Sequence, residues 1–395
     1  MKNIRDSYQA TQYACFVGYV IQAIVNNFVP LLFLTFESEY GISIQKITLL
    51  ITINFMVQLC VDLLSAIFTD KIGFRVAAIM AHVLACVGLF CLSVLPSIMP
   101  DPYMGIIISV CLYAMGSGLI EVIISPIMES CPTPNKEKAM SILHSFYCWG
   151  HAGIVLISTV FFAVFGIENW RYLAIAWSVL SLLNCILFAN VPLAPLLPEG
   201  QKSMSLYEMA RSKVFWLLML MMMCAGASEQ AVSQWASTFA EGALGVSKSM
   251  GDLMGPMFFA ICMGASRAYF GAGKADNLDR FMKASSVLCI ISYLVITLIP
   301  VPIVNLLGCG LCGLSVGIMW PGTFSKCAKA MPLGGAAVFS LMALAGDLGC
   351  STGPTLVGVV AGCFDGDLKA GILSGIVFPL LLIVGLVCVG RKETA

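Results

Sequence analysis

The stretch Gly116-Ser117-Gly118-Leu119-Ile120-Glu121-Val122-Ile123-Ile124-Ser125-Pro126 places a carboxylic acid inside an apolar run that is long enough to cross a lipid bilayer. A carboxylate at that depth costs roughly 2.5–3.5 kcal/mol even on insertion-based scales, so it is a functional candidate by default. At helical spacing, Ser117, Glu121 and Ser125 share one face. The stretch therefore predicts a transmembrane helix with a polar face that lines a cavity.

The composition of the whole chain supports a membrane protein. Of its 395 residues, 59% are hydrophobic and 11% are charged, and the net charge is zero. This balance gives no indication of a nucleic-acid partner. The 17 cysteines are scattered through apolar segments, so we interpret them as small buried hydrophobic residues rather than as disulfides or metal ligands.

Apolar runs of about twenty residues recur along the chain and predict an all-α protein with twelve transmembrane helices. The first run is too long for the core of a signal peptide, so we expect it to remain as the first helix. The expected spans are 13–36, 46–68, 76–96, 103–129, 140–165, 170–190, 214–240, 249–270, 281–300, 303–325, 334–362 and 369–390.

Lysine and arginine residues set the expected orientation, because cytoplasmic loops carry an excess of them. With the N-terminus in the cytoplasm, seventeen of the 21 basic residues fall on the cytoplasmic side, Arg267 among them. The outer side holds only Lys46, Arg171, Lys248 and Lys369. This count predicts that both termini are cytoplasmic, and it leaves no basic residue for the middle of a helix.

A polar, proline-containing linker divides the chain. The segment 191–213 contains Pro192, Pro195 and Pro198, and it separates six expected helices in 1–190 from six in 214–395. Gly118 precedes Pro126 by the same spacing as Gly313 precedes Pro321 in the other half. We therefore expect two pseudo-symmetric six-helix bundles.

The loop Ala66-Ile67-Phe68-Thr69-Asp70-Lys71-Ile72-Gly73-Phe74-Arg75 resembles the loop signature of the major facilitator superfamily. Ala66 stands where that motif usually has glycine, and the second half has no equivalent aspartate beside Arg267. Asp70 can cap the next helix, pair with Arg75 or contact a facing helix end, and Gly73 permits a tight turn. The resemblance implies a loop that helps to gate the exchange between conformations and does not touch substrate.

Within that superfamily the chain looks most like the fucose and glucose permease branch. The resemblance rests on three motifs: the Gly-x-Gly-x-x-Glu of 116–121, the pair Glu229 and Trp235, and the glycines of 346–354. It implies a sugar:cation symporter whose helices one, four, seven and ten line the central cavity. The first helix departs from the branch, because Asn26 and Asn27 stand where an acid is expected.

Buried polar and aromatic residues supply the candidate site. A structural hydrogen bond is the alternative role for each carboxylate, and ordinary packing is the alternative for each aromatic ring. The candidates for coupling or protonation are Glu121, Glu229 and Asp347. The candidates for substrate binding are Gln22, Asn26, Asn27, Tyr147, His151, Gln234, Trp235 and Trp320. The candidates for a cytoplasmic gating network are Asp62, Asp70, Gly73, Arg75 and Glu129.

These observations lead to one functional hypothesis and one alternative. Since no buried base is expected opposite an anion, we expect a secondary transporter that moves a neutral solute, a monosaccharide, by symport with a proton or sodium. The alternative is a proton-coupled efflux pump for lipophilic or cationic drugs. No nucleotide-binding loop or catalytic constellation is present in the sequence, so we expect neither an enzyme nor a cofactor. We expect a monomer in the cytoplasmic membrane, with the lipid bilayer as its surroundings and no nucleic-acid partner.

Overall fold

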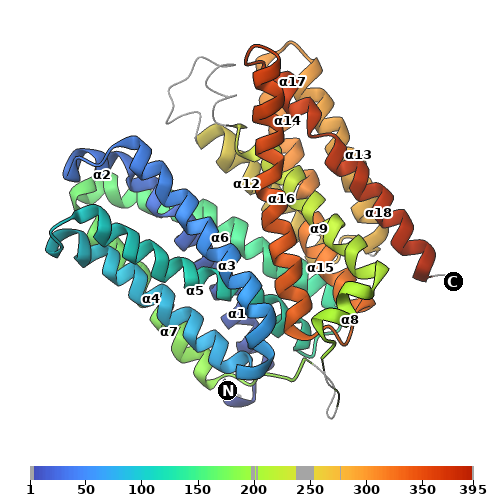
Figure 1. Cartoon of the computed structure of the whole chain (residues 1–395), viewed down its shortest axis with the longest axis horizontal. Helices are drawn as coiled ribbons and strands as arrows, with labels where there is room; N and C mark the ends of the chain where they lie inside the picture. The colour runs from blue at the N-terminus through green and yellow to red at the C-terminus, as the bar shows by residue number, and fades with distance from the viewer. Residues whose placement is uncertain (1–3, 197–200, 202, 237–252, 276, 394–395) are drawn as a thin grey trace. The chain divides into compact units, whose positions relative to one another are not determined.

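A computed structural model of the chain describes residues 4–196, 201, 203–236, 253–275 and 277–393. Every regular element in these ranges is helical (Figure 1). The first part of the chain forms α1 (Tyr8–Asn27), α2 (Phe33–Tyr40), α3 (Ile44–Ile72), α4 (Phe74–Ile98), α5 (Pro102–Ser130), α6 (Lys136–Phe165) and α7 (Trp170–Asn190). It also has short 3-10 turns, η1 (Ile4–Asp6), η2 (Val29–Leu32) and η3 (Ile167–Asn169).

The second part of the chain is built in the same way. Its α-helices are α8 (Leu206–Arg211), α9 (Lys213–Ser233), α12 (Phe258–Gly271), α13 (Leu278–Leu298), α14 (Pro302–Val316), α15 (Met319–Ala330), α16 (Gly335–Cys363), α17 (Leu368–Ser374) and α18 (Val377–Glu393). A π-helical turn, η4 (Leu253–Met257), precedes α12.

Eleven segments of the described chain are long and apolar enough to cross a membrane. Each corresponds to one expected span, which confirms an all-helical, multi-pass membrane protein. The remaining expected span, 249–270, begins outside the described residues and is represented from Leu253 onward by η4 and α12. The twelfth crossing and the cytoplasmic position of the termini stay predictions.

The contacts within the chain group it into two compact units. The first unit contains Met1–Thr133, Trp149–Gln201 and Gly335–Ser340, and the second contains Pro134–Cys148, Lys202–Gly334 and Leu341–Ala395. The boundary therefore passes through helices α6 and α16. The expected division into bundles 1–190 and 214–395 differs from these units at both helices and stays a prediction.

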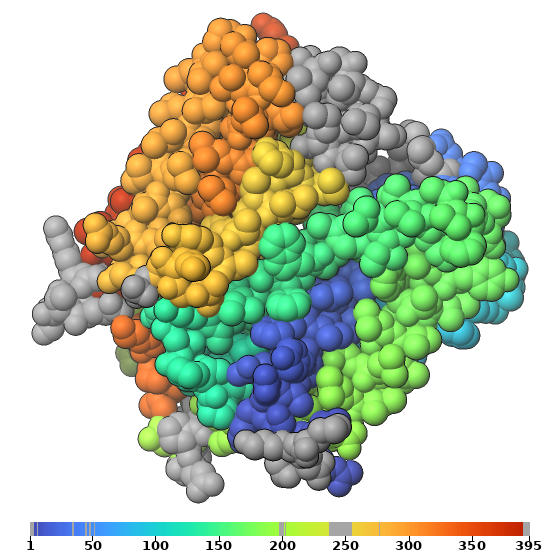
Figure 2. Space-filling model, turned by 180° about the vertical axis from the view of Figure 1, so that it is seen from behind, coloured from blue at the N-terminus to red at the C-terminus, as the bar shows by residue number. Residues whose placement is uncertain are grey.

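In the first unit, α4 packs against α5 and α7, while α1 lies against α5 and α7. Figure 2 shows α1 and α7 side by side, and the Asn184 amide of α7 donates to the Ala14 carbonyl of α1 at 3.1 Å. Close packing of α4 and α5 depends on Gly116, where a Cβ atom would lie 2.6 Å from the Ala81 carbonyl oxygen. Small residues of this kind allow membrane helices to approach closely.

In the second unit, α12 packs against α14, as Figure 2 shows, and α9 packs against α18. Helices α9 and α16 approach backbone to backbone, since a Cβ atom on Gly349 would lie 2.0 Å from the Met223 carbonyl oxygen. The glycines of the 346–354 motif therefore allow close packing of the two helices.

Two helices are interrupted beside the polar residues. Helix α1 ends at Asn27, and Pro30 lies in the following turn η2. The expected tenth helix is divided into α14 and α15 at Gly317 and Ile318. Phe28, Gly317 and Ile318 keep right-handed helical backbone angles, so both breaks change the hydrogen-bonding pattern of the helix without unwinding it.

Candidate functional site

A group of hydrogen-bonded polar side chains joins α1, α3 and α5 in the first unit. Glu121 on α5 accepts a hydrogen bond from Gln22 Nε2 on α1, at 2.7 Å from its Oε2. Gln22 is 4% exposed, whereas Glu121 is partly exposed. The structure thus brings together two residues that the sequence analysis selected from different helices.

The group continues through α3. Asn26, one turn after Gln22, accepts through Oδ1 from Gln58 Nε2 at 3.0 Å and from Asn54 Nδ2 at 3.3 Å. Gln58 Oε1 in turn accepts from the Ser117 hydroxyl at 3.3 Å, and Ser117 lies one turn before Glu121 on α5. We call the six residues Gln22, Asn26, Asn54, Gln58, Ser117 and Glu121 the amide cluster.

Two amide oxygens of the amide cluster are buried without a hydrogen-bond partner among the described residues. They are Gln22 Oε1 and Asn54 Oδ1, and Asn54 is 7% exposed. Leaving a buried polar atom unsatisfied costs about 1–3 kcal/mol, so such atoms usually meet a donor, a water or a ligand. Both oxygens could therefore accept a hydrogen bond from a water molecule or a ligand.

Sequence analysis missed Asn54 and Gln58, although a signal was present. Together with Asp62 they follow one another at intervals of four along α3, which places three polar side chains on one helical face. All three are buried, at 7%, 1% and 0% exposure. The repeated spacing of polar residues on an otherwise apolar helix was the observation that could have found them.

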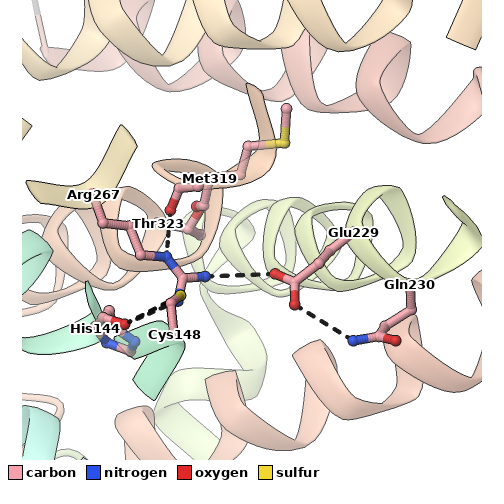
Figure 3. Close-up of polar contacts among 8 residues, drawn as sticks. His144, Cys148, Glu229, Gln230, Arg267, Met319 and Thr323 are labelled. Atoms are coloured by element: carbon pink, nitrogen blue, oxygen red, sulfur yellow. Dashed lines mark hydrogen bonds and ion pairs between the residues drawn. The ribbon is translucent and has the colours of Figure 1, made fainter. Parts of the chain in front are cut away.

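The second unit contains a different arrangement around Arg267 of α12 (Figure 3). Its guanidinium donates through Nε to the Gly317 carbonyl at 2.8 Å and through Nη1 to the His144 carbonyl at 3.0 Å. Nη1 also lies 3.2 Å from Cys148 Sγ, and Nη2 lies 3.5 Å from Glu229 Oε2. We call Arg267, His144, Cys148, Glu229 and Gly317 the arginine cluster.

The arginine cluster corrects one expectation. The sequence count assigned Arg267 to a cytoplasmic loop, yet it lies within a helix and is 4% exposed. The interruption between α14 and α15 frees the Gly317 carbonyl to receive it, and Glu229 balances its charge. Lys326 is buried to the same extent and is paired with Asp279. The premise that no base is buried was therefore wrong.

The aromatic candidates of the second unit are engaged in packing. The ring of Trp320 occupies the space that a side chain at Gly346 would need, 2.1 Å from that Cβ position. It also contacts Phe324, which stacks on His144 at a ring distance of 5.7 Å. Trp235 lies beside Gly358 of α16, and its indole nitrogen has no partner among the described residues.

The structure places the remaining binding candidates, and the coupling candidate Asp347, as follows. The Asn27 amide donates to the Ala23 carbonyl of its own helix at 2.8 Å. Gln234 is exposed at the end of α9, and Asp347 is partly exposed on α16. Tyr147 and His151 are partly exposed and lie one turn apart on α6, on either side of the boundary between the units.

The loop motif makes two separate helix-end contacts. Asp70 Oδ1 accepts from the Ala336 amide in the first turn of α16, at 2.9 Å, which is the facing helix end among its three expected partners. Arg75 donates to the carbonyls of Phe188, Ala189 and Val191 at the C-terminus of α7, at 2.9–3.0 Å.

The other gating candidates lie along the same helices. Gly73 joins α3 to α4 with a φ of +83°, a conformation that suits glycine. Asp62 is fully buried on α3, and Glu129 is partly exposed at the end of α5. The gating role of the five residues stays a prediction.

Comparison with known proteins gives a consistent result. The sequence model of the Major Facilitator Superfamily matches residues 15–354, whereas no curated protein matches the chain. Among solved structures, a major facilitator transporter, FucP, in the outward conformation is 14% identical, with a TM-score of 0.82 over 97% of this chain and 99% of that one.

Two further solved structures share the fold. The proton:xylose symporter XylE, bound to 6-bromo-6-deoxy-D-glucose, is 11% identical, with a TM-score of 0.80 over 97% of this chain and 95% of that one. The human organic anion transporter TETRAN is 14% identical, with a TM-score of 0.74 over 97% of this chain and 100% of that one. At these identities the similarity shows the fold alone.

Proposed function

Because the chain belongs to the Major Facilitator Superfamily of membrane transporters, we propose that it carries a small neutral solute, a monosaccharide, by alternating access. Transport is symport with a proton or sodium ion, coupled through Glu121, and it takes place in the cytoplasmic membrane. The observation that carries this proposal is the hydrogen bond between Gln22 and Glu121, beside amide oxygens that are buried without partners.

The chemistry of the amide cluster supports a hydroxyl-bearing solute. Its side chains are amides, a hydroxyl and a single carboxylate, which orient a ligand by hydrogen bonds. The orphan oxygens of Gln22 and Asn54 would accept from sugar hydroxyls. The likeness in fold to the fucose:proton symporter FucP and to XylE is consistent with this class of solute.

The buried bases still favour a neutral solute, for a different reason from the one the sequence indicated. Arg267 is paired with Glu229 and Lys326 with Asp279, so each positive charge has a carboxylate beside it. An anion would have to displace one of these partners. This pairing also assigns Glu229 to holding Arg267 rather than to coupling, whereas Asp347 remains a candidate for coupling.

The alternative of drug efflux has less support. A pump for lipophilic cations needs aromatic surface that is available to the drug. Trp320 is packed against Gly346, and Trp235 lies beside Gly358. Both rings therefore serve helix packing.

Substitution of Glu121 by glutamine tests the proposal in proteoliposomes. Gln22 can still hydrogen-bond to the new amide, so we expect the fold and the exchange of solute across the membrane to persist. Accumulation driven by a proton or sodium gradient should fall at least tenfold, because the side chain no longer changes its charge.

The test solutes are L-fucose, D-xylose and D-glucose in labelled form. Each sugar is assayed for accumulation and for counterflow. Glu168→Gln is the matched control, since Glu168 is exposed in the turn before α7. Accumulation that survives Glu121→Gln would show that this carboxylate is structural. Absence of counterflow for every sugar in the wild-type protein would reject the monosaccharide.

A further inference from the structure

We propose that the short helix α8 and the first turn of α9 bind the headgroup of an anionic phospholipid at the surface of the bilayer. The residues that would bind it are Leu206, Tyr207, Arg211, Lys213 and Trp216, which we call the α8 patch. All five side chains are exposed. The site is separate from both polar clusters, so it does not depend on the solute that the protein carries.

Helix α8 lies immediately before a membrane span. That span is α9, and the single residue Ser212 separates it from α8. The Ser212 hydroxyl caps α9 by accepting from the Phe215 amide at 3.4 Å. Tyrosine, tryptophan and basic residues at the end of a span lie at the boundary between lipid tails and water. The sequence order therefore places the α8 patch at the level of the lipid headgroups.

Helix α8 is fixed to the protein on one face. Met209 is fully buried, and just before α8 the Met204 amide donates to the Leu333 carbonyl at 2.8 Å. Tyr207 and Arg211 each lie two residues from Met209, so they project from the opposite face of the helix. A helix that is anchored on one side and presents amphipathic side chains on the other is suited to the membrane interface.

Two contacts show that aromatic and basic side chains of the α8 patch converge. The Arg211 guanidinium carbon lies 4.9 Å from the centre of the Tyr207 ring. The Trp216 Nε1 donates to the Ala210 carbonyl at 2.7 Å, which brings the indole back to the end of α8. Trp216 is nevertheless 58% exposed. Because its one polar hydrogen is already used, the exposed part of its ring is an apolar surface.

The charge of the α8 patch stays positive because the neighbouring acid is engaged elsewhere. Between residues 203 and 213 the bases are Arg211 and Lys213, and the acid is Glu208. Glu208 accepts from the backbone amide and the hydroxyl of Ser205, at 2.7 and 2.9 Å. The aromatic ring beside Arg211 attracts the cation without cancelling its charge. The patch is therefore complementary to an anion.

A second cation–π pair shows how a structural arginine differs from Arg211. The Arg171 guanidinium carbon lies 5.0 Å from the ring centre of Trp170, and the guanidinium also forms an ion pair with Glu39. Arg171 therefore ties α7 to α2. The contact that the described structure shows for the Arg211 guanidinium is the ring of Tyr207, so its N–H donors are available to a ligand.

An anionic phospholipid matches each part of the α8 patch. Its phosphate would accept hydrogen bonds from Arg211 and would lie near the charge of Lys213. The upper part of its acyl chains would cover Leu206 and Trp216. A zwitterionic lipid carries a positive group that offsets its phosphate, so we expect it to bind more weakly. Free phosphate has no acyl chain and would leave the apolar surface in water.

Thermal unfolding of the purified full-length protein in detergent tests the site. The probes are dioctanoyl phosphatidylglycerol, dioctanoyl phosphatidylcholine and sodium phosphate, the last compared with sodium chloride at equal ionic strength. We expect phosphatidylglycerol to raise the melting temperature in a saturable manner. Phosphatidylcholine should need a concentration at least tenfold higher for the same effect, and sodium phosphate should have none.

The basic residues are tested by removing their charge. Arg211→Gln and Lys213→Gln should each raise the phosphatidylglycerol concentration at half effect about fivefold, as expected for one base at a lipid surface. Arg211→Lys, which keeps the charge, should lose less. Lys329→Gln is the matched control, because Lys329 is exposed at the end of α15, and it should behave as the wild type.

The outcomes that would overturn the site are specific. Equal half-effect concentrations for the two phospholipids would show that the α8 patch does not select an anionic headgroup. Stabilisation by sodium phosphate alone would assign the bases to a soluble anion instead of a lipid. A response to phosphatidylglycerol that is unchanged in Arg211→Gln and in Lys213→Gln would place lipid binding elsewhere on the protein. Counting bound phosphatidylglycerol by native mass spectrometry of the wild type and of Arg211→Lys decides the question if a glutamine variant does not fold.

Discussion

The amide cluster and the arginine cluster each hold a glutamate among membrane helices, but the two glutamates face different chemistry. Glu121 receives the amide of Gln22, whereas Glu229 lies beside the guanidinium of Arg267. In the amide cluster two buried oxygens remain without partners in the described structure. In the arginine cluster all three guanidinium nitrogens have partners, on α6, on α9 and at Gly317 between α14 and α15.

This difference distinguishes a group of residues that can bind a ligand from one that stabilises the fold. A buried charge pair with complete hydrogen bonding gains nothing from a further ligand and loses much when one partner is removed. A group with spare acceptors gains when a cation or a donor arrives. On this basis we propose that coupling takes place in the first unit and that the ion pair of the second unit has a structural role.

The largest effect is expected from Arg267→Leu, which leaves Glu229 charged and buried without its partner. Removing one member of a buried ion pair costs roughly 3–5 kcal/mol. We expect a large fall in melting temperature and in the monodisperse fraction on size-exclusion chromatography.

The double variant Arg267→Met/Glu229→Met should recover most of that loss, because no charge remains to be balanced. Arg280→Met, at an exposed position of α13, is the control and should behave as the wild type. A mild effect of Arg267→Leu would contradict the structural role and would return Glu229 to the candidates for coupling.

An effect of intermediate size is expected from substitution of two asparagines of the first unit, which should lose different amounts of stability. Asn184→Leu removes the donor to the Ala14 carbonyl and to His82 Nε2, which lie 3.1 and 2.8 Å away, so it should cost about 2–3 kcal/mol. Asn54→Leu removes an orphan oxygen and one long hydrogen bond, so it should change stability by less than about 1 kcal/mol. Chemical unfolding of the two variants measures the contrast, and equal losses would show that Asn54 is a fixed structural partner.

The smallest effect is expected outside both clusters, at the capping box of α8. Ser205 donates to Glu208 through its backbone amide and its hydroxyl, and these bonds lower the pKa of Glu208. The stabilisation is therefore present above the ordinary pKa of a glutamate and is lost as the pH falls through the lowered pKa.

Melting temperatures of the wild type and of Glu208→Gln, measured from pH 7 to pH 3, should differ slightly at neutral pH and converge in acid. A constant difference over this range would show that the carboxylate charge does not contribute. Because Glu208 lies outside both clusters, sugar counterflow should not change in this variant.

Individual residues show how much of the structure could be predicted from the sequence. The apolar runs predicted the eleven described spans, because their length and hydropathy are local properties. Glu121 was found in the same way, as a charge in an apolar run. Arg267 was misplaced because a single basic residue near a helix end usually belongs to a loop, and nothing in the local sequence shows that Glu229 and Gly317 meet it.

The sequence by itself determined the class of the protein, its spans and the presence of acids at membrane depth, since each follows from the cost of exposing polar groups to lipid. Only the tertiary structure decided which acid faces an amide and which faces a guanidinium. Those pairings depend on contacts between residues 99 positions apart for Gln22 and Glu121, and 38 positions apart for Glu229 and Arg267. Helix packing alone brings such residues together.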